Sequence, residues 1–316
     1  IAPICKRTLR RQVEAYVKYT RRIPMLQEFV PGADETKLYN YVSEFLQRPS
    51  LYALPNSQRQ LITLVLRKLL ASSTFAIAGA LETLIKRLSG QLSQTLDEKA
   101  ATNEFADLAD ELDQDYEALD ELADESTQMR DAVADDSTKA TVTNPTASEI
   151  AAIRAEVGEL ESFRDLAISI TENAKGTALL QALNVAFKKL DELGAAKKAI
   201  VFTESRRTQD YLLKLLAGTE HGPGVVLFNG SNNDAKAKEI YGKWIERHAD
   251  TDRVTGSRTA DTRAALVDYF RDESGKGGSI MIATEAGAEG INPQFCSMVT
   301  NYDLPWNPPR IEQRIG

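Results

Sequence analysis

The chain has 316 residues, 42% of them hydrophobic, so it can bury a core, and its length suggests about two domains. No apolar run reaches the roughly 18 to 20 residues that cross a bilayer, and five arginines among the first 30 residues argue against a signal peptide, so we expect a cytoplasmic location. The two cysteines and two histidines have none of the spacings of zinc sites or disulfide frameworks, so we expect no metal site in this chain.

The net charge of -8 is concentrated in one stretch. Residues 97–136 hold sixteen acidic residues against Lys99 and Arg130, a balance of about -14 that leaves the remainder mildly basic, near +6. The overall charge therefore does not exclude binding to DNA.

Both ends of the chain have the sequence of a domain interior. It begins at Ile1 without methionine and stops at Gly316, inside a helix predicted to begin near Pro308. We therefore expect the chain to be a piece of a longer protein.

Residues 5–91 alternate basic and apolar residues at helical spacing, which predicts helices with short breaks. The breaks are expected at Pro24, Pro31 and Pro55.

Residues 92–172 carry two apolar stripes of helical period, which predict an antiparallel helical hairpin. Thr146 followed by Glu149 forms a capping box at the start of the second helix, after a polar stretch that contains Pro145. The first stripe, on the acidic segment, consists of Phe105, Leu108, Leu112, Tyr116, Leu119 and Leu122, and the second of Ile150, Ile153, Val157, Leu160, Phe163 and Ala167.

After a predicted helix over 177–193, the pattern changes to short apolar runs typical of buried parallel strands. Strands are predicted over 199–202, 225–228, 280–283 and 298–302, and helices over 205–217, 234–248 and 259–272. Strands that alternate with helices predict an α/β fold with a parallel sheet, in which ligands bind at the carboxyl ends of the strands.

The segment 282–292, IATEAGAEGIN, follows one predicted strand and is rich in small residues. Gly287 and Gly290 would let the backbone pass close to a ligand, and Thr284 offers a hydroxyl and an amide to a phosphate. Taken alone, the same pattern also fits an ordinary turn from a strand to a helix.

Three further motifs accompany this segment, in chain order: VFTES at 201–205, TGSRTADTRAALVDYF at 255–270 and VTNYDLPWNPPRIEQRIG at 299–316. With the loop after Thr284, they resemble motifs IV, IVa, V, Vb and the start of VI in the second RecA-like lobe of superfamily-two motors. The GIN sequence and the Tyr-Asp-Leu-Pro-Trp-Asn-Pro run resemble the Swi/Snf branch, and the composition of residues 1–90 is most similar to its bacterial RapA-like subgroup. The expected fold is therefore a RecA-like parallel-sheet lobe, incomplete at its C-terminus, preceded by a mainly α-helical region.

The resemblance implies a role for each matching residue. Gly290 and Asn292 turn towards the ribose of ATP, while Gln313 and Arg314 open motif VI near the ATP cleft. Trp306 either packs as a brace or contacts a ligand. The residues expected to contact DNA phosphates, without reading sequence, are Thr203, Ser205, Gly256, Ser257 and Thr284. For Arg263, a phosphate contact and a salt bridge inside the lobe are both open.

The sequence also departs from a complete motor of this kind. No GxxxxGK[ST] loop is present, and the acidic run Asp110 to Asp113 has no apolar strand before it, so it is interpreted as a solvated helix face. The resemblance places the arginine fingers beyond Gly316, and Mg²⁺ in the absent first lobe. The long interval 229–254 predicts an extra helix with Tyr241 and Trp244 on its packed side, which leaves the start of motif IVa open.

The resemblance implies three regions. Residues 1–91 would lead from the first lobe, 92–172 form the inserted hairpin, and 173–316 form the second lobe. The leading hypothesis is an ATP-dependent translocase on double-stranded DNA, of which this piece alone is catalytically inactive. Two alternatives are an acidic hairpin that binds a protein partner and an RNA-directed helicase of the same superfamily.

Overall fold

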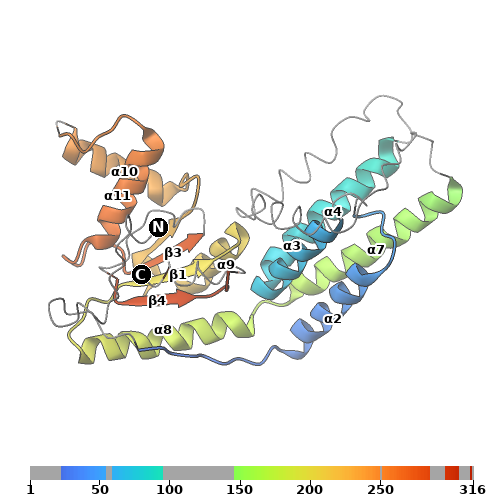
Figure 1. The fold of residues 1–316 in the computed structure, drawn as a ribbon, viewed down its shortest axis with the longest axis horizontal. Helices are drawn as coiled ribbons and strands as arrows, with labels where there is room; N and C mark the ends of the chain where they lie inside the picture. The colour runs from blue at the N-terminus through green and yellow to red at the C-terminus, as the bar shows by residue number, and fades with distance from the viewer. Residues whose placement is uncertain are drawn as a thin grey trace, which may run out of the picture.

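The computed structural model describes residues 23–54, 59–94, 146–249, 251–284, 296–305 and 314. It has two parts that lie side by side, which we call the helical unit and the lobe (Figure 1). No helix in the described ranges is long and apolar enough to cross a membrane. The helical unit contains α2 (Ala33–Gln47), α3 (Arg59–Ser72), α4 (Thr74–Gln94) and α7 (Ala147–Ser169). The lobe contains α8 (Ala174–Glu192), β1 (Ala199–Thr203), α9 (Arg206–Ala217), the single-turn η1 (Gly222–Gly224), β2 (Val225–Phe228), α10 (Ala235–His248), α11 (Arg258–Arg271), β3 (Ile280–Thr284) and β4 (Met298–Asn301).

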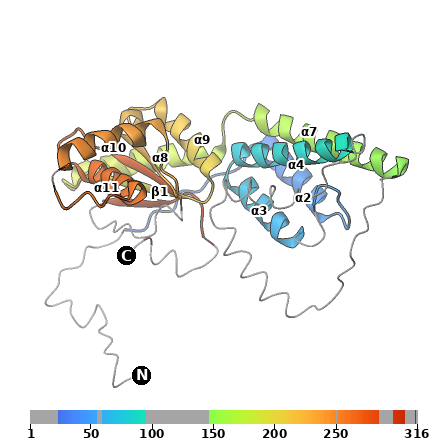
Figure 2. The same ribbon diagram turned by 90° about the horizontal axis from the view of Figure 1, so that it is seen from above.

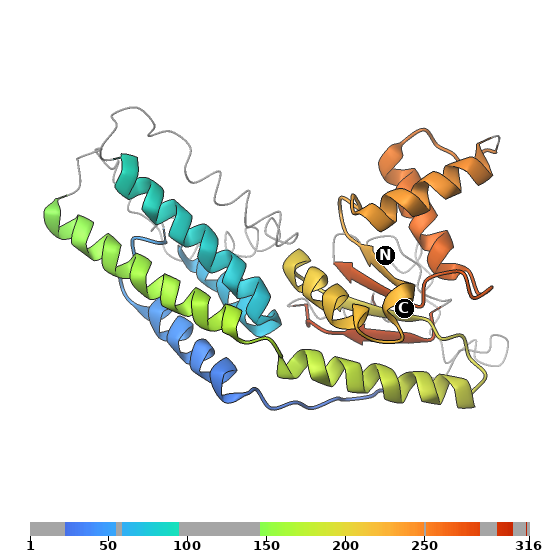
Figure 3. The same ribbon diagram turned by 180° about the vertical axis from the view of Figure 1, so that it is seen from behind.

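The helical unit is built around α4 and α7, which run antiparallel (Figures 1 and 3). Asn173, just after α7, accepts a hydrogen bond from the backbone N–H of Thr74 at the start of α4, 3.0 Å away. Further along, Arg164 of α7 pairs with Glu82 of α4 at 2.9 Å. One apolar core joins all four helices, so residues from both sides of position 92 pack together.

Helix α7 begins as its sequence predicts. The Thr146 hydroxyl accepts from the Glu149 N–H at 3.3 Å, and the Glu149 carboxylate accepts from the Thr146 N–H at 2.7 Å, which confirms the capping box. The predicted apolar stripe of α7 is also confirmed, because Ile153, Leu160 and Phe163 are buried in the core. The acidic stripe of residues 105–122 lies outside the described residues, so its packing and the division at residue 92 stay predictions.

The lobe is a four-stranded parallel sheet in the order β2-β3-β1-β4, which confirms the predicted strands and the α/β class. Successive side chains of a strand point to opposite faces of the sheet, so each strand contributes side chains to two cores. Val201 and Ile282 pack with α8 and α9 on one face, while Phe202 and Met281 pack with α10 and α11 on the other. Burial on both faces explains why β1, β2 and β3 read as nearly continuous apolar runs.

The predicted extra helix in the interval 229–254 is α10. Trp244 is buried in the core beneath it, and its indole N–H donates to Asp268 of α11 at 2.8 Å. Tyr241 is half-buried, with the Arg258 guanidinium 5.7 Å from its ring centre. Both aromatic residues therefore help to hold α10 against α11, as the sequence predicts.

Candidate functional site

The carboxyl ends of the parallel strands gather the predicted site residues along one edge of the sheet. Thr203 ends β1 and Thr284 ends β3, and the two are register partners in adjacent strands. Both are completely buried. Two residues selected from different motifs, 81 positions apart by their numbers, are thus neighbours in space.

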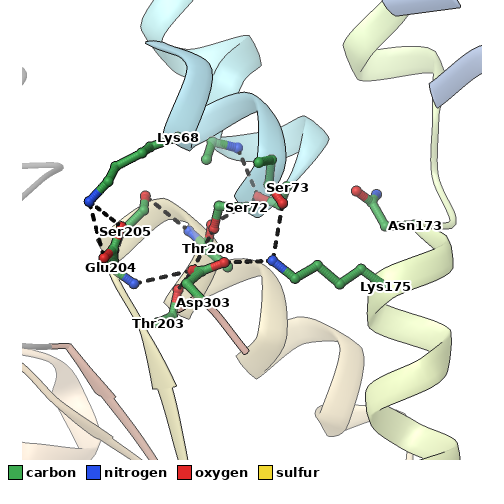
Figure 4. Close-up of polar contacts among 12 residues, drawn as sticks. Lys68, Ser72, Ser73, Asn173, Lys175, Thr203, Glu204, Ser205, Thr208 and Asp303 are labelled. Atoms are coloured by element: carbon green, nitrogen blue, oxygen red, sulfur yellow. Dashed lines mark hydrogen bonds and ion pairs between the residues drawn. The ribbon is translucent and has the colours of Figure 1, made fainter. Parts of the chain in front are cut away.

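The Thr203 hydroxyl is engaged inside the protein. It donates a 2.6 Å hydrogen bond to the carboxylate of Asp303, which follows β4 (Figure 4). The backbone N–H of Glu204 donates to the same oxygen at 3.2 Å. The predicted contact between Thr203 and a DNA phosphate stays a prediction, and in this conformation its hydroxyl serves to hold the end of β1 against the end of β4.

Ser205 is the N-cap of α9, and its hydroxyl accepts from the Thr208 N–H at 3.4 Å. The side chain is completely buried. An oxygen at the N-cap satisfies one of the four N–H groups that a helix leaves unpaired. The Ser205 side chain therefore has a local structural role, and its predicted phosphate contact is not tested by this geometry.

The TGS segment forms a tight turn before α11. Gly256 has φ +82°, a left-handed conformation that glycine adopts without strain. The Asp261 carboxylate accepts from the N–H and hydroxyl of Thr255, at 2.9 and 2.7 Å, and from the Gly256 N–H at 3.2 Å. Gly256 and Ser257 are exposed, and Ser257 caps α11. The turn thus exposes the backbone at the start of α11, where the Ser257 N–H also donates within the turn, to the Thr255 hydroxyl at 3.2 Å.

Asp261→Asn is expected to loosen this turn. Hydrogen bonds from Thr255, and then from Gly256, lower the pKa of the Asp261 carboxyl. A lowered folded pKa gives stability that is fully present above the unfolded value, about 3.9, and is lost as the pH falls through the folded value. At pH 7 the variant should melt a few degrees below the wild type. Thermal unfolding followed by circular dichroism should show that the difference in melting temperature between wild type and variant disappears below about pH 4. A difference in melting temperature that does not depend on pH would contradict the role of the charge.

The two remaining charged candidates both pack against strand aromatics. The Arg263 guanidinium lies 5.1 Å from the ring centre of Phe228 at the end of β2, and the side chain is half-buried. This packing does not decide between a phosphate contact and a salt bridge. Arg314 is buried over Phe202 at 4.7 Å, and its Nη1 donates to the Asn301 side chain at 3.0 Å and to the Asp303 carbonyl at 3.1 Å.

Arg314 is therefore fixed at the strand ends, beside β1 and β4. The other residues predicted near the nucleotide, Gly290, Asn292 and Gln313, lie outside the described residues, as does Trp306.

Sequence reasoning missed the residues that organise this edge. Asp303 accepts hydrogen bonds from the ends of α3 and β1, and Lys175 of α8 pairs with it at 2.6 Å. Lys68 of α3 pairs with Glu204 at 3.0 Å. The position of Asp303, two residues after the end of β4, was a usable signal, since polar residues there lie at the strand-end edge. Lys68 and Lys175 lie on helices far away in sequence, where no local pattern marks them.

Comparison with known proteins agrees with this architecture. Residues 178–316 match the family described as the helicase conserved C-terminal domain. The chain is 36% identical over 147 residues to "Uncharacterized ATP-dependent helicase YqhH" of Bacillus subtilis (strain 168), a match that covers 46% of this chain and 19% of that protein.

Shorter matches extend to a second group of relatives. The chain is 48% identical over 48 residues to the RNA polymerase-associated protein RapA of Vibrio campbellii and of Vibrio cholerae, covering 15% of this chain and 5% of each relative. The chain thus spans a fifth or less of the length of these curated relatives. The match of residues 178–316 to the helicase conserved C-terminal domain, together with the similarity of the chain to YqhH and RapA, agrees with the RecA-like lobe that the resemblance to Swi/Snf-type superfamily-two motors predicts.

Proposed function

We propose that this chain supplies the second motor lobe of an ATP-dependent translocase on double-stranded DNA. The observation that carries the proposal is the strand-end edge of a helicase C-terminal domain, where Thr203 and Thr284 lie side by side and the TGS turn exposes the N-terminus of α11. Exposed backbone at a helix N-terminus suits contacts with phosphates that do not read sequence, and the buried Thr203 and Thr284 shape the strand ends beside it. The lobe would hold one strand of the duplex while a first lobe moves relative to it.

ATP is the cofactor that the family implies, and the charge of Arg314 fits it. A guanidinium suits a triphosphate, and the hydrogen bonds of Arg314 to Asn301 and the Asp303 carbonyl fix its position at the strand ends. Gly290, Asn292 and Gln313 would contribute the other contacts on this side of the cleft. ATP supplies the free energy that opens and closes the two lobes, and the residues of this chain bind and orient it.

No group of three acidic, histidine or cysteine side chains in the described ranges is placed to hold a metal ion. We assign Mg²⁺ and the hydrolytic carboxylate to a first lobe, and we propose that this chain alone does not hydrolyse ATP. We also place the protein in the cytoplasm.

Thr284→Ala and Gly290→Ala in the full-length protein test the role of the loop after β3. Each should lower the DNA-stimulated ATPase rate about tenfold, equivalent to about 1.4 kcal/mol of transition-state stabilisation. Circular dichroism should show an intact fold, and Thr36→Ala, on α2 and remote from the sheet, is the matched control. Unchanged stimulation in both variants would remove this loop from the proposed site.

The helical unit supports a second role, in binding a protein partner. Helices α4 and α7 extend away from the lobe, so their far ends are remote from the strand-end edge (Figures 1 and 2). One group of relatives is named as RNA polymerase-associated. The immobilised chain should therefore retain purified RNA polymerase. A variant that lacks residues 95–145, which connect α4 to α7, should not retain it. Equal retention of both chains would place any contact elsewhere.

A further inference from the structure

The Asp303 carboxylate joins the helical unit to the lobe. Its Oδ2 accepts from the Ser72 hydroxyl at the end of α3 at 2.7 Å, in addition to the Thr203 hydroxyl of β1. Its Oδ1 accepts from the Lys175 ammonium of α8 at 2.6 Å, and Lys175 also donates to the Ala71 carbonyl at 3.0 Å (Figure 4). The Asp303 side chain is only 8% exposed, so these charge-assisted hydrogen bonds act away from water.

A second polar bridge lies beside the first. The Lys68 ammonium of α3 contacts Glu204 at 3.0 Å, and the two side chains are 10% and 7% exposed. The Thr208 hydroxyl on α9 is 2.7 Å from that of Ser72 and 3.0 Å from that of Ser73. The end of α3 is therefore tied both to the end of β1 and to the first turn of α9.

Close packing surrounds these polar contacts. The Phe75 ring of α4 stacks on Tyr211 of α9, with ring centres 4.8 Å apart and planes at 18°. Gly79 leaves a notch in α4 that the Arg207 side chain fills, because a Cβ there would lie 1.3 Å from its guanidinium. A Cβ at Gly176 would lie 2.0 Å from the Tyr211 hydroxyl. Interfaces packed this tightly have few alternative arrangements.

The backbone of Asp303 contacts Arg314 and the end of β1. Its carbonyl accepts from Arg314 at 3.1 Å, and its N–H donates to the Phe202 carbonyl at 3.2 Å. One residue thus contacts the helical unit through its carboxylate and fixes Arg314 through its carbonyl.

We propose that Asp303 is a positioning residue that fastens the helical unit to the lobe as a rigid arm and, by the same residue, sets the position of Arg314. Any rotation of the lobe then carries the far ends of α4 and α7 with it. The use of this arm in a motor cycle rests on the proposed function, because it requires that nucleotide binding moves the lobe. The rigid attachment itself does not depend on DNA or ATP.

The attachment is tested by the distance between two spin labels in the 316-residue chain, measured by double electron-electron resonance. The labels are placed at Arg154→Cys on α7 and Lys238→Cys on α10, both exposed, with Cys5 and Cys296 replaced by serine. The wild-type junction should give a single narrow distance peak. Asp303→Asn should abolish that single peak, because it weakens the contact with Ser72 of the helical unit and releases Lys175, whose ammonium also donates to the Ala71 carbonyl of that unit.

Three further variants separate positioning from general destabilisation. Lys175→Met should broaden the distribution as Asp303→Asn does, and it serves as the test if the latter fails to fold. Lys175→Arg should keep the narrow distance peak of the wild type, because it keeps the positive charge at this position. Glu159→Gln, which breaks an exposed ion pair with Arg48 inside the helical unit, should leave the peak unchanged.

A narrow peak in both Asp303→Asn and Lys175→Met would overturn the inference. That outcome is distinguishable from failure of the proposed function, which would instead appear as ATPase activity indifferent to duplex DNA in the full-length protein.

Discussion

Asp303→Ala is expected to lower the free energy of unfolding of the chain by about 3–5 kcal/mol, the loss typical of removing one partner of a buried ion pair. The substitution leaves the Lys175 ammonium without its carboxylate and deprives the buried hydroxyls of Ser72 and Thr203 of their acceptor. Asp303→Asn should cost less, because its amide oxygen still accepts hydrogen bonds. Urea unfolding followed by circular dichroism measures both differences.

Asp165→Ala is the control for this measurement. Asp165 pairs with Arg164 on α7, but its side chain is 67% exposed, so its loss should cost less than about 1 kcal/mol. A cost for Asp303→Ala as small as that of the control would show that the junction does not depend on this carboxylate.

The Lys68 and Glu204 pair should behave as a coupled unit. Lys68→Met leaves the Glu204 carboxylate, 7% exposed, without its ammonium partner, and should cost about 3 kcal/mol. Glu204→Gln alone should also destabilise the fold, because it removes the carboxylate that pairs with the Lys68 ammonium. The double variant should recover a large part of the loss, because no unbalanced charge then stays buried. A double-mutant cycle in urea measures the coupling directly.

The exposed pair of Lys243 and Glu239 on α10 provides the matching control cycle. These side chains are 69% and 63% exposed, so solvent screens their charges and their coupling should be much smaller than that of the buried pair. Losses for Lys68→Met and Glu204→Gln that simply add would mean that the buried pair does not join the helical unit to the lobe.

The sequence predicted the lobe well because its signals are local. Short apolar runs bounded by polar turns located β1 to β4, and the capping box placed the start of α7 at the residue where the structure has it. The resemblance likewise predicted that Thr203 and Thr284 belong to one site, and the parallel register brings them together. Periodicity is a property of neighbouring residues, so it identifies elements more readily than their partners.

The junction was not predictable for the same reason. The Ser72 hydroxyl meets the Asp303 carboxylate across 231 positions, and Lys68 meets Glu204 across 136. The two apolar stripes predicted the acidic segment 105–122, which lies outside the described residues, as the partner of α7, and they gave no sign that α4 packs against α7. Nor could the sequence show that the hydroxyls of Thr203 and Ser205 are occupied by Asp303 and by the first turn of α9.

Because the hydroxyls of Thr203 and Ser205 already have partners inside the protein, in this conformation they would not be the groups through which the lobe grips DNA. Gly256 and Ser257 are exposed at the start of α11, whereas Thr203 and Ser205 shape the strand-end edge from inside. A grip of this kind has backbone amides at its surface and a buried polar network beneath it. The same polar network also contacts the helical unit. It therefore connects the proposed DNA site and Arg314 to that unit.

The central claim, a motor on double-stranded DNA, is tested most directly by ATPase activity. The full-length protein is assayed without nucleic acid, with duplex DNA and with single-stranded RNA, beside the 316-residue chain under the same conditions. Duplex DNA should stimulate ATP hydrolysis by the full-length protein, and the 316-residue chain alone should hydrolyse no ATP. A full-length protein that ignores duplex DNA, or responds only to RNA, would contradict the claim.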